Sequence, residues 1–200
     1  MKKVVAIVAV MVLMMGLSAY AQDVASCKGK LNAIGYGAYA IGFGDVFDDT
    51  KMTVGNVTTE HSFDAGLGFG VIGQYGVLDK LFVGLEVGLQ MYKAEAKTTG
   101  AQIPVPDVDE TNTEVNILAN GMYAISYTDD LNAFFITAGL GMYGGDNSEF
   151  GLNGGFMFRR MLSPNVGVMV MPRFHYVMSD PAGTMAQIAA GVVIPIPLNK

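Results

Sequence analysis

The chain has 200 residues, with 26 glycines, one cysteine and no tryptophan, which corresponds to one domain without a disulfide framework. Its 18 acidic and 12 basic residues give a formal net charge of −6. An acidic chain without a basic stripe argues against nucleic acid as a partner.

The first residues have the form of a secretory signal peptide. A basic start, Met1-Lys2-Lys3, precedes an uncharged apolar run and an Ala19-Tyr20-Ala21 cleavage site. The run from Val4 to Leu17 is too short for a membrane-spanning helix, which needs about 20 residues. We therefore expect residues 1–21 to be removed.

Residues 22–30 are predicted to form a periplasmic segment ahead of the folded domain. Within it, Val24-Ala25-Ser26-Cys27 resembles a lipobox, so a lipidated Cys27 is one alternative. The other is an unmodified thiol. A charge at Asp23 suits lipoprotein processing poorly and favours the second alternative.

A run of alternating residues from Ser62 to Tyr92 carries the clearest structural signal. Apolar residues, most of them large, occupy nearly every second position on both sides of a turn at 76–80. Period two over this length is typical of β-strands. The intervening positions are mostly small or polar and too sparsely charged to coat a water-facing surface. This division is typical of strands with an apolar lipid face and a polar lumen face.

Eight strands follow from the same pattern, and they place the folded domain at residues 31–194, with a tail at 195–200. In chain order the predicted strands are 31–43, 63–75, 81–92, 114–125, 133–143, 150–160, 166–178 and 185–194. The predicted fold class is all-β, an eight-stranded antiparallel transmembrane β-barrel. Side chains fill the interior of a barrel of this size, so we expect no open pore.

Two long polar connections are predicted, from Gly44 to His61 and from Ala96 to Thr113. They alternate with short turns near 76, 126 and 163, as external loops alternate with periplasmic turns in such barrels. Their acidic residues could hold a divalent cation, but they lack EF-hand spacing and are predicted to be solvated. These residues are Asp45, Asp48, Asp49, Asp107, Asp109 and Glu110.

The last third of the chain resembles the small eight-stranded outer-membrane barrels, namely the transmembrane domain of outer-membrane protein A and the opacity-type, porin-like adhesins. The residues that carry this resemblance are Ala138-Gly139-Leu140-Gly141-Met142-Tyr143 and, within 151–176, Leu162 to Val168 and Arg173-Phe174-His175-Tyr176. The resemblance implies an outer-membrane location. The chain departs from the family at its end, Ile194 to Lys200, where an aromatic residue is usual.

Six ionisable residues are predicted to face the lumen and form an ion-pair network: Asp64, Glu86, Glu114, Arg159, Arg173 and His175. Buried charges are stable only when they are paired, so Glu86 is expected to meet Arg159 or Arg173.

Two further motifs have structural explanations. The literal G-x-G-x-x-G from Gly68 to Gly73 lies inside an alternating strand, whereas a dinucleotide site needs it at a strand-to-helix turn. Tyrosines near the predicted strand ends are expected to form girdles at the membrane interfaces. They are Tyr36, Tyr75, Tyr92, Tyr123, Tyr127, Tyr143 and Tyr176.

The function predicted from these features is that of a non-enzymatic outer-membrane barrel, without cofactor or metal, that supports envelope integrity or surface interaction through its external loops. Its expected partners are outer-membrane lipid and extracellular ligands, and it is expected to be a monomer. One alternative is a lipid A-modifying enzyme that uses His175, Ser179 and Glu86. Another is a soluble periplasmic lipocalin-like barrel, in which the apolar positions from Leu81 to Leu89 would point inward.

Overall fold

The computed structural model describes residues 26–43, 50–54, 57–63, 65–99, 108–127, 132–144, 148–179 and 183–198. The predicted signal peptide at 1–21 lies outside these residues. Within them, no helix is long and apolar enough to cross a membrane.

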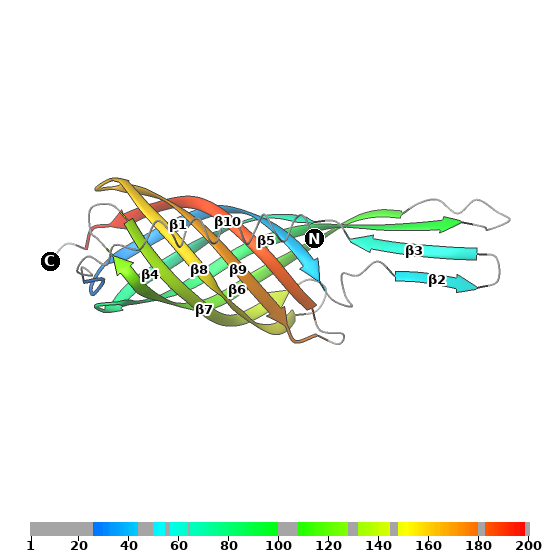
Figure 1. Ribbon diagram of the computed structural model, residues 1–200, viewed down its shortest axis with the longest axis horizontal. Coiled ribbons are helices and arrows are strands. Elements are labelled where there is room, and N and C mark those ends of the chain that lie inside the picture. The colour runs from blue at the N-terminus through cyan, green and yellow to red at the C-terminus, as the bar shows by residue number, and fades with distance from the viewer. Residues whose placement is uncertain are drawn as a thin grey trace.

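The described residues form ten strands, connected in chain order as shown in Figure 1. They are β1 (Leu31–Phe43), β2 (Thr50–Val54), β3 (Val57–Phe63), β4 (Gly66–Leu78), β5 (Leu81–Thr99), β6 (Val108–Tyr127), β7 (Asn132–Gly144), β8 (Ser148–Ser163), β9 (Val166–Val177) and β10 (Gly183–Ile196).

Eight of these strands close into a barrel. Their order around it is β5, β4, β1, β10, β9, β8, β7 and β6, and pairing of β5 with β6 completes the circle. Each neighbouring pair is antiparallel, including the first and last strands, β1 and β10. The predicted fold class is therefore confirmed.

Alternation along β5 shows why this sequence closes with its apolar face outward. Val83, Leu85 and Val87 are exposed, Leu85 to 69%, while Phe82 and Glu86, at positions of the other parity, are buried. Because successive side chains of a strand point to opposite faces, one set of alternate residues lies on the outer wall and the other set lies in the lumen. The predicted orientation of this strand is confirmed.

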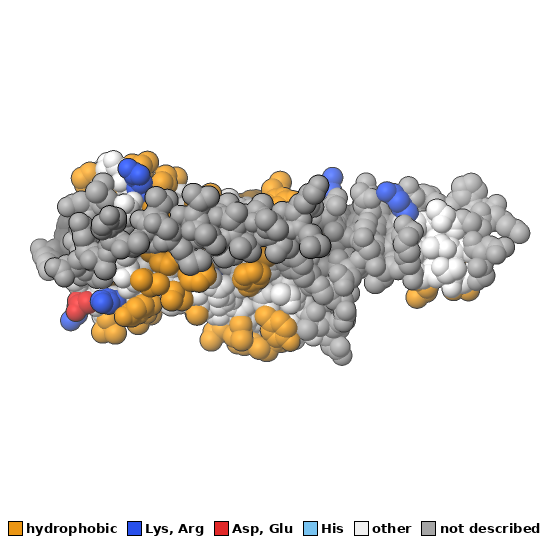
Figure 2. Space-filling model, viewed as in Figure 1, with side chains coloured by type: hydrophobic (Ala, Val, Ile, Leu, Met, Phe, Trp, Pro, Cys, Tyr) orange, Lys and Arg blue, Asp and Glu red, His pale blue; other side chains and the backbone are white. Residues whose placement is uncertain are grey.

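The outer wall of the barrel is largely apolar. Figure 2 shows hydrophobic side chains grouped along the part of the wall that it displays. The exposed residues come from all around the barrel and include Tyr39, Leu67, Phe69, Val71, Leu85, Ile117, Ile136, Leu140, Leu152, Phe174, Tyr176 and Ile194. A contiguous apolar surface of this kind marks contact with lipid or protein, which argues against the soluble lipocalin-like alternative.

The two long connections contain strands that the sequence analysis did not predict. The first includes β2 and β3, and in the second β5 continues to Thr99 while β6 begins at Val108. A strand needs about 9–11 residues to cross a bilayer, whereas β5 has 19 and β6 has 20. Figure 1 shows the surplus projecting beyond one end of the barrel, where β3 pairs with β5. We call this sheet of β2, β3 and the ends of β5 and β6 the extension.

The predicted second strand, 63–75, is divided between two elements. Phe63 ends β3, opposite Ala94, and Leu67 in β4 lies opposite Met91. Both strands run antiparallel to β5 along the same edge, and β3 ends at Phe63 while β4 begins at Gly66. The apolar pattern of the sequence continues from Phe63 to Leu67, which is why it predicts one strand, whereas the register against β5 shifts by one residue between them.

Residues 26–30 dock against the β4–β5 turn at the opposite end of the barrel, which we call the short-turn end. The Cys27 amide donates to the Asp79 carbonyl, and the Gly29 amide donates to the Gly76 carbonyl, both at 2.8 Å. Gly29 has a φ of 77°, which glycine adopts without strain. The Cys27 side chain is fully buried in an apolar cluster inside the barrel that includes Phe82.

We predict that Gly76→Ala undocks this segment, because a Cβ atom at Gly76 would overlap the Cys27 carbonyl. Maleimide labelling of the folded protein in detergent should be slow for the wild type and at least several-fold faster for the variant. Gly35→Ala is the matched control, since a Cβ atom there meets nothing within 4 Å. Equal labelling rates in all three proteins would contradict the docking.

Candidate functional site

A buried ion pair between Glu86 on β5 and Arg173 on β9 lies in the lumen. Arg173 donates from Nη1 to Glu86 Oε2 at 2.6 Å and from Nη2 to Oε1 at 2.7 Å. Each side chain is 1% exposed. Paired, parallel hydrogen bonds of this type are the strongest that a guanidinium forms with a carboxylate. Of the two partners that the sequence analysis considered for Glu86, the structure brings Arg173 to it.

Two more donors complete the environment of Glu86. The Tyr36 hydroxyl donates to Oε1 at 2.5 Å, and Asn120 Nδ2 donates to Oε2 at 2.7 Å. The carboxylate thus receives hydrogen bonds from β1, β6 and β9, three strands spread around the barrel. Such a set offsets the cost of removing the charge from water and links distant parts of the wall.

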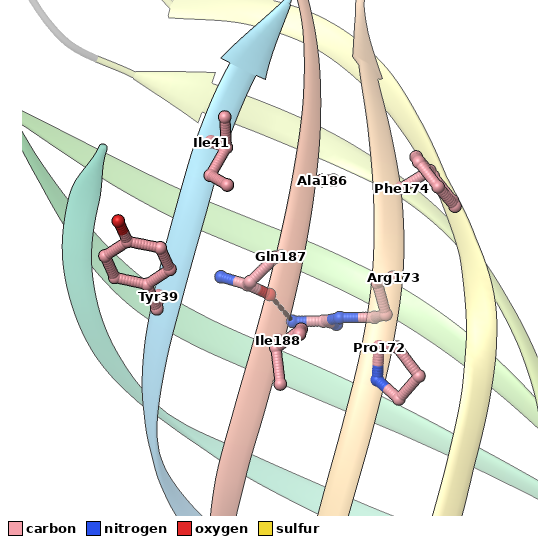
Figure 3. Close-up of a pocket in the computed structure, with 8 residues that line it drawn as sticks. All are labelled: Tyr39, Ile41, Pro172, Arg173, Phe174, Ala186, Gln187 and Ile188. Carbon is pink, nitrogen blue, oxygen red and sulfur yellow. Dashed lines mark hydrogen bonds between the residues drawn. The ribbon is translucent and has the colours of Figure 1, made fainter. Parts of the chain in front are cut away.

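Arg173 is held in turn by Gln187 on β10. Its Nη2 donates to Gln187 Oε1 at 2.7 Å, and Figure 3 shows the two side chains pointing toward one another from neighbouring strands. Gln187 Nε2 donates to Gln90 Oε1 at 3.3 Å, which carries the network back to β5. The guanidinium also lies over the Tyr36 ring, 5.9 Å from its centroid.

His175 joins the same network on the side nearer the extension. Its Nδ1 lies 2.7 Å from the Tyr143 hydroxyl, and its Nε2 lies 3.3 Å from Gln187 Oε1. The two rings meet edge to face, with centroids 5.7 Å apart. His175 is buried inside the barrel, so both ring nitrogens face lumen side chains.

The other three predicted lumen residues are Arg159, Glu114 and Asp64. Arg159 is buried, but its guanidinium carbon lies over the Phe135 ring, 5.4 Å from the centroid, in the cluster nearer the short-turn end. Glu114 on β6 lies opposite Gln90 and is partly exposed. Asp64 lies outside the described residues.

The predicted acidic loop residues also divide into two groups. Asp45, Asp48, Asp49 and Asp107 lie outside the described residues. The backbones of Asp109 and Glu110 belong to the first residues of strand β6, beyond the barrel, opposite Glu95 and Ala94. This placement corrects their assignment to a loop. Among the described residues, no group of three His, Cys, Asp or Glu side chains could hold a metal ion.

The tyrosine girdle prediction is wrong for Tyr36, Tyr92 and Tyr143, which are buried in the lumen. Tyr75, Tyr123 and Tyr176 are exposed on the outer wall, as a girdle requires. Position near a strand end misled the prediction, because the parity of each residue along its strand decides the face. Tyr36 shares the inward parity of Ile34 and Ala38, and that signal was available in the sequence.

Two inward glycines explain how Tyr36 reaches the ion pair. A Cβ atom at Gly70 would lie 2.5 Å from the Tyr36 hydroxyl, and one at Gly88 would lie 2.8 Å from it. Real Cβ atoms do not approach so closely, so both positions must remain glycine for the hydroxyl to lie where it does. Gly70, one of the three glycines of the apparent nucleotide fingerprint, therefore makes room for a lumen side chain.

Comparison with known proteins supports the fold and goes no further. No protein-family model matches the chain, and no curated protein sequence matches it significantly. Neisserial surface protein A is 15% identical over 82% of this chain and 96% of its own, with a TM-score of 0.55. OprG, an outer membrane protein of Pseudomonas aeruginosa, is 13% identical over 88% of this chain and 100% of its own, with a TM-score of 0.51. The predicted resemblance to small eight-stranded outer-membrane barrels is thus confirmed at the level of the fold.

We predict that Glu86→Gln lowers the free energy of unfolding by about 3–5 kcal/mol, because it leaves Arg173 as an unpaired buried charge. Urea unfolding in detergent micelles measures this loss. The double variant Glu86→Leu, Arg173→Met should recover most of it, since it removes both charges and keeps the volume. A loss below about 1 kcal/mol for the single variant would show that the pair does not stabilise the barrel.

Proposed function

We propose that the protein is a non-enzymatic β-barrel of the outer membrane with a closed lumen, which contributes to envelope integrity or surface interaction through its extension. The inverted polarity of the barrel carries this proposal. Large apolar residues such as Leu85 and Phe174 are exposed on the wall, whereas Glu86 and Arg173 are buried inside. Only a nonpolar solvent around the barrel makes this distribution favourable.

The lumen is filled in three layers. An apolar cluster that includes Cys27, Phe82 and Met157 occupies the short-turn end. The network around Glu86 and Arg173 lies in the middle. A second cluster with Tyr92, Leu118, Tyr143 and Met185 lies toward the extension, where the Tyr92 hydroxyl contacts the Met185 sulfur. This filling supports a role other than general diffusion of solutes.

The extension supports a role at the surface. By analogy with barrels of this class, short turns face the periplasm and the longer connections face outward, which would place the extension outside the cell. Its threonines bond across strands: Thr53 Oγ1 lies 3.1 Å from Thr58 Oγ1, and Thr59 Oγ1 lies 3.3 Å from Thr98 Oγ1. Met52 is exposed on this sheet, so an ordered surface with an apolar element is available to a partner.

The geometry does not favour the lipid A-modifying alternative. Such an enzyme would need its base on the lipid-facing wall, whereas His175 is buried in the lumen beside Tyr143 and Gln187. Glu86, the proposed carboxylate, is bound by Arg173 through both of its oxygens. The proposed base and carboxylate thus take part in closing the lumen.

The membrane location predicts the behaviour of the protein on fractionation. It should sediment with outer membranes, resist extraction by salt or carbonate, and dissolve only in detergent. Unheated samples should migrate differently from boiled samples on gels, because the closed barrel resists unfolding. In planar bilayers the purified protein should show no steady open channel. Recovery in the soluble periplasmic fraction would overturn the proposed location.

The proposed absence of lipid chemistry predicts that expression in a Gram-negative host leaves the mass spectrum of lipid A unchanged. His175→Ala and Ser179→Ala should give the same spectrum as the wild type. A change in lipid A mass that appears with the wild type and disappears with His175→Ala would instead establish the enzymatic alternative.

A further inference from the structure

We infer that water molecules are bound in the lumen along one row of amide side chains, which we call the amide row. It consists of Asn32 on β1, Gln74 on β4, Asn120 on β6 and Asn153 on β8. Each of these residues is at most 7% exposed, so bulk solvent outside the barrel does not hydrate them. A water site in the lumen goes beyond the surface role proposed above and does not depend on it.

Strand pairing places these residues in one continuous row. Residues directly opposite one another on neighbouring strands lie on the same face of a sheet. In order, the opposed residues are Asn32, Gln74, Gly84, Asn120, Gly139, Asn153, His175 and Met185. Met185 then lies opposite Gly42, so one circuit of the barrel returns to β1 near the other end of that strand. The row therefore climbs the lumen from the short-turn end toward the extension.

Six buried atoms of the amide row have no hydrogen-bond partner among the described residues. They are Asn32 Nδ2, Gln74 Nε2 and Oε1, Asn120 Oδ1, and Asn153 Nδ2 and Oδ1. Buried polar atoms almost always have a partner, either in the protein or in an ordered water molecule. The amide row thus has the polarity of a binding site for a small ligand.

The ligand is water because the six atoms include both donors and acceptors. An amide nitrogen donates and an amide oxygen accepts. In Gln74 and Asn153 both amide atoms are without a described partner, so this mixture holds whichever way either amide is turned. A cation would satisfy only the oxygens and an anion only the nitrogens. A water molecule donates and accepts, and in a protein interior it typically makes about three hydrogen bonds.

Gly139 brings an acceptor and a donor of the row to one place. It lies between Asn120 and Asn153, and a Cβ atom there would overlap Asn120 Oδ1 and lie 2.7 Å from Asn153 Nδ2. The two amides therefore converge over position 139. A water molecule beside them accepts a hydrogen bond from Asn153 and donates one to Asn120.

The amide row meets the ion-pair network at two points. Asn120 Nδ2 donates to Glu86 Oε2 at 2.7 Å, which leaves the Asn120 oxygen for another partner. Asn153 lies opposite His175, whose Nε2 lies 3.3 Å from Gln187 Oε1. Bound water thus adds hydrogen bonds next to the buried charges, which lowers the cost of keeping them out of bulk solvent.

Magnetisation transfer from water in NMR spectra of the folded protein in detergent tests the site. The α-protons of Gly139 do not exchange with solvent, so a nuclear Overhauser effect from water to these protons reports a bound molecule directly. We expect this effect in the wild type and its loss in Asn153→Leu, which replaces the amide by an apolar side chain of similar size. Leu152→Met is the matched control and should retain the effect, because Leu152 is adjacent in β8 but 42% exposed on the outer wall.

Urea unfolding in detergent micelles gives an independent readout. Asn153→Leu and Gln74→Leu should each lower the urea midpoint, because the bound water loses one partner while its other partners stay buried. An amide that is buried without water behaves in the opposite way, since an apolar replacement removes a cost and raises the midpoint. Heat-dependent gel migration verifies that each variant is folded.

An unchanged or raised midpoint for either variant, or no effect from water at Gly139 in the wild type, would overturn the inference. A folded, membrane-inserted barrel without water in its lumen defeats this inference alone, whereas a protein that does not enter membranes defeats the proposed function.

Discussion

The pairing of Glu86 with Arg173 is the constraint on which the interior of this barrel depends. Neither charge is stable when buried without the other, and the two residues are 87 apart in sequence, on β5 and β9. Tyr36 and Asn120 then occupy the remaining positions around the carboxylate. Once this layer is assembled, every strand that contributes to it is held in one register.

Alternation made most of the barrel predictable from sequence. The predicted first strand, 31–43, agrees with β1, whose alternation leaves Tyr39 exposed on the wall and buries Ile34, Tyr36 and Ala38 in the lumen. The same parity predicted that Glu86, Arg173 and His175 share the interior. Distances across the lumen were not predictable, so the choice between Arg173 and Arg159 required the fold.

The extension and the inward tyrosines could not be derived as easily. Residues 50–63 contain many polar and β-branched positions without a strong apolar period, since a sheet outside the membrane has no lipid face to mark. Its strands form because β5 offers a continued edge for β3. For Tyr92 the parity that it shares with Glu86 gave the inward face, but an amphipathic ring at a strand end is equally compatible with a membrane interface.

The continuity of β5 and β6 from the barrel into the extension has a thermodynamic consequence for recognition. Irregular loops lose conformational entropy when a partner orders them, and that loss weakens binding. Here the threonine-bonded strands around Thr58 and Thr98 are already in register with a barrel wall. A partner that binds the extension therefore meets a preorganised surface, and less of its contact energy is spent on ordering the protein.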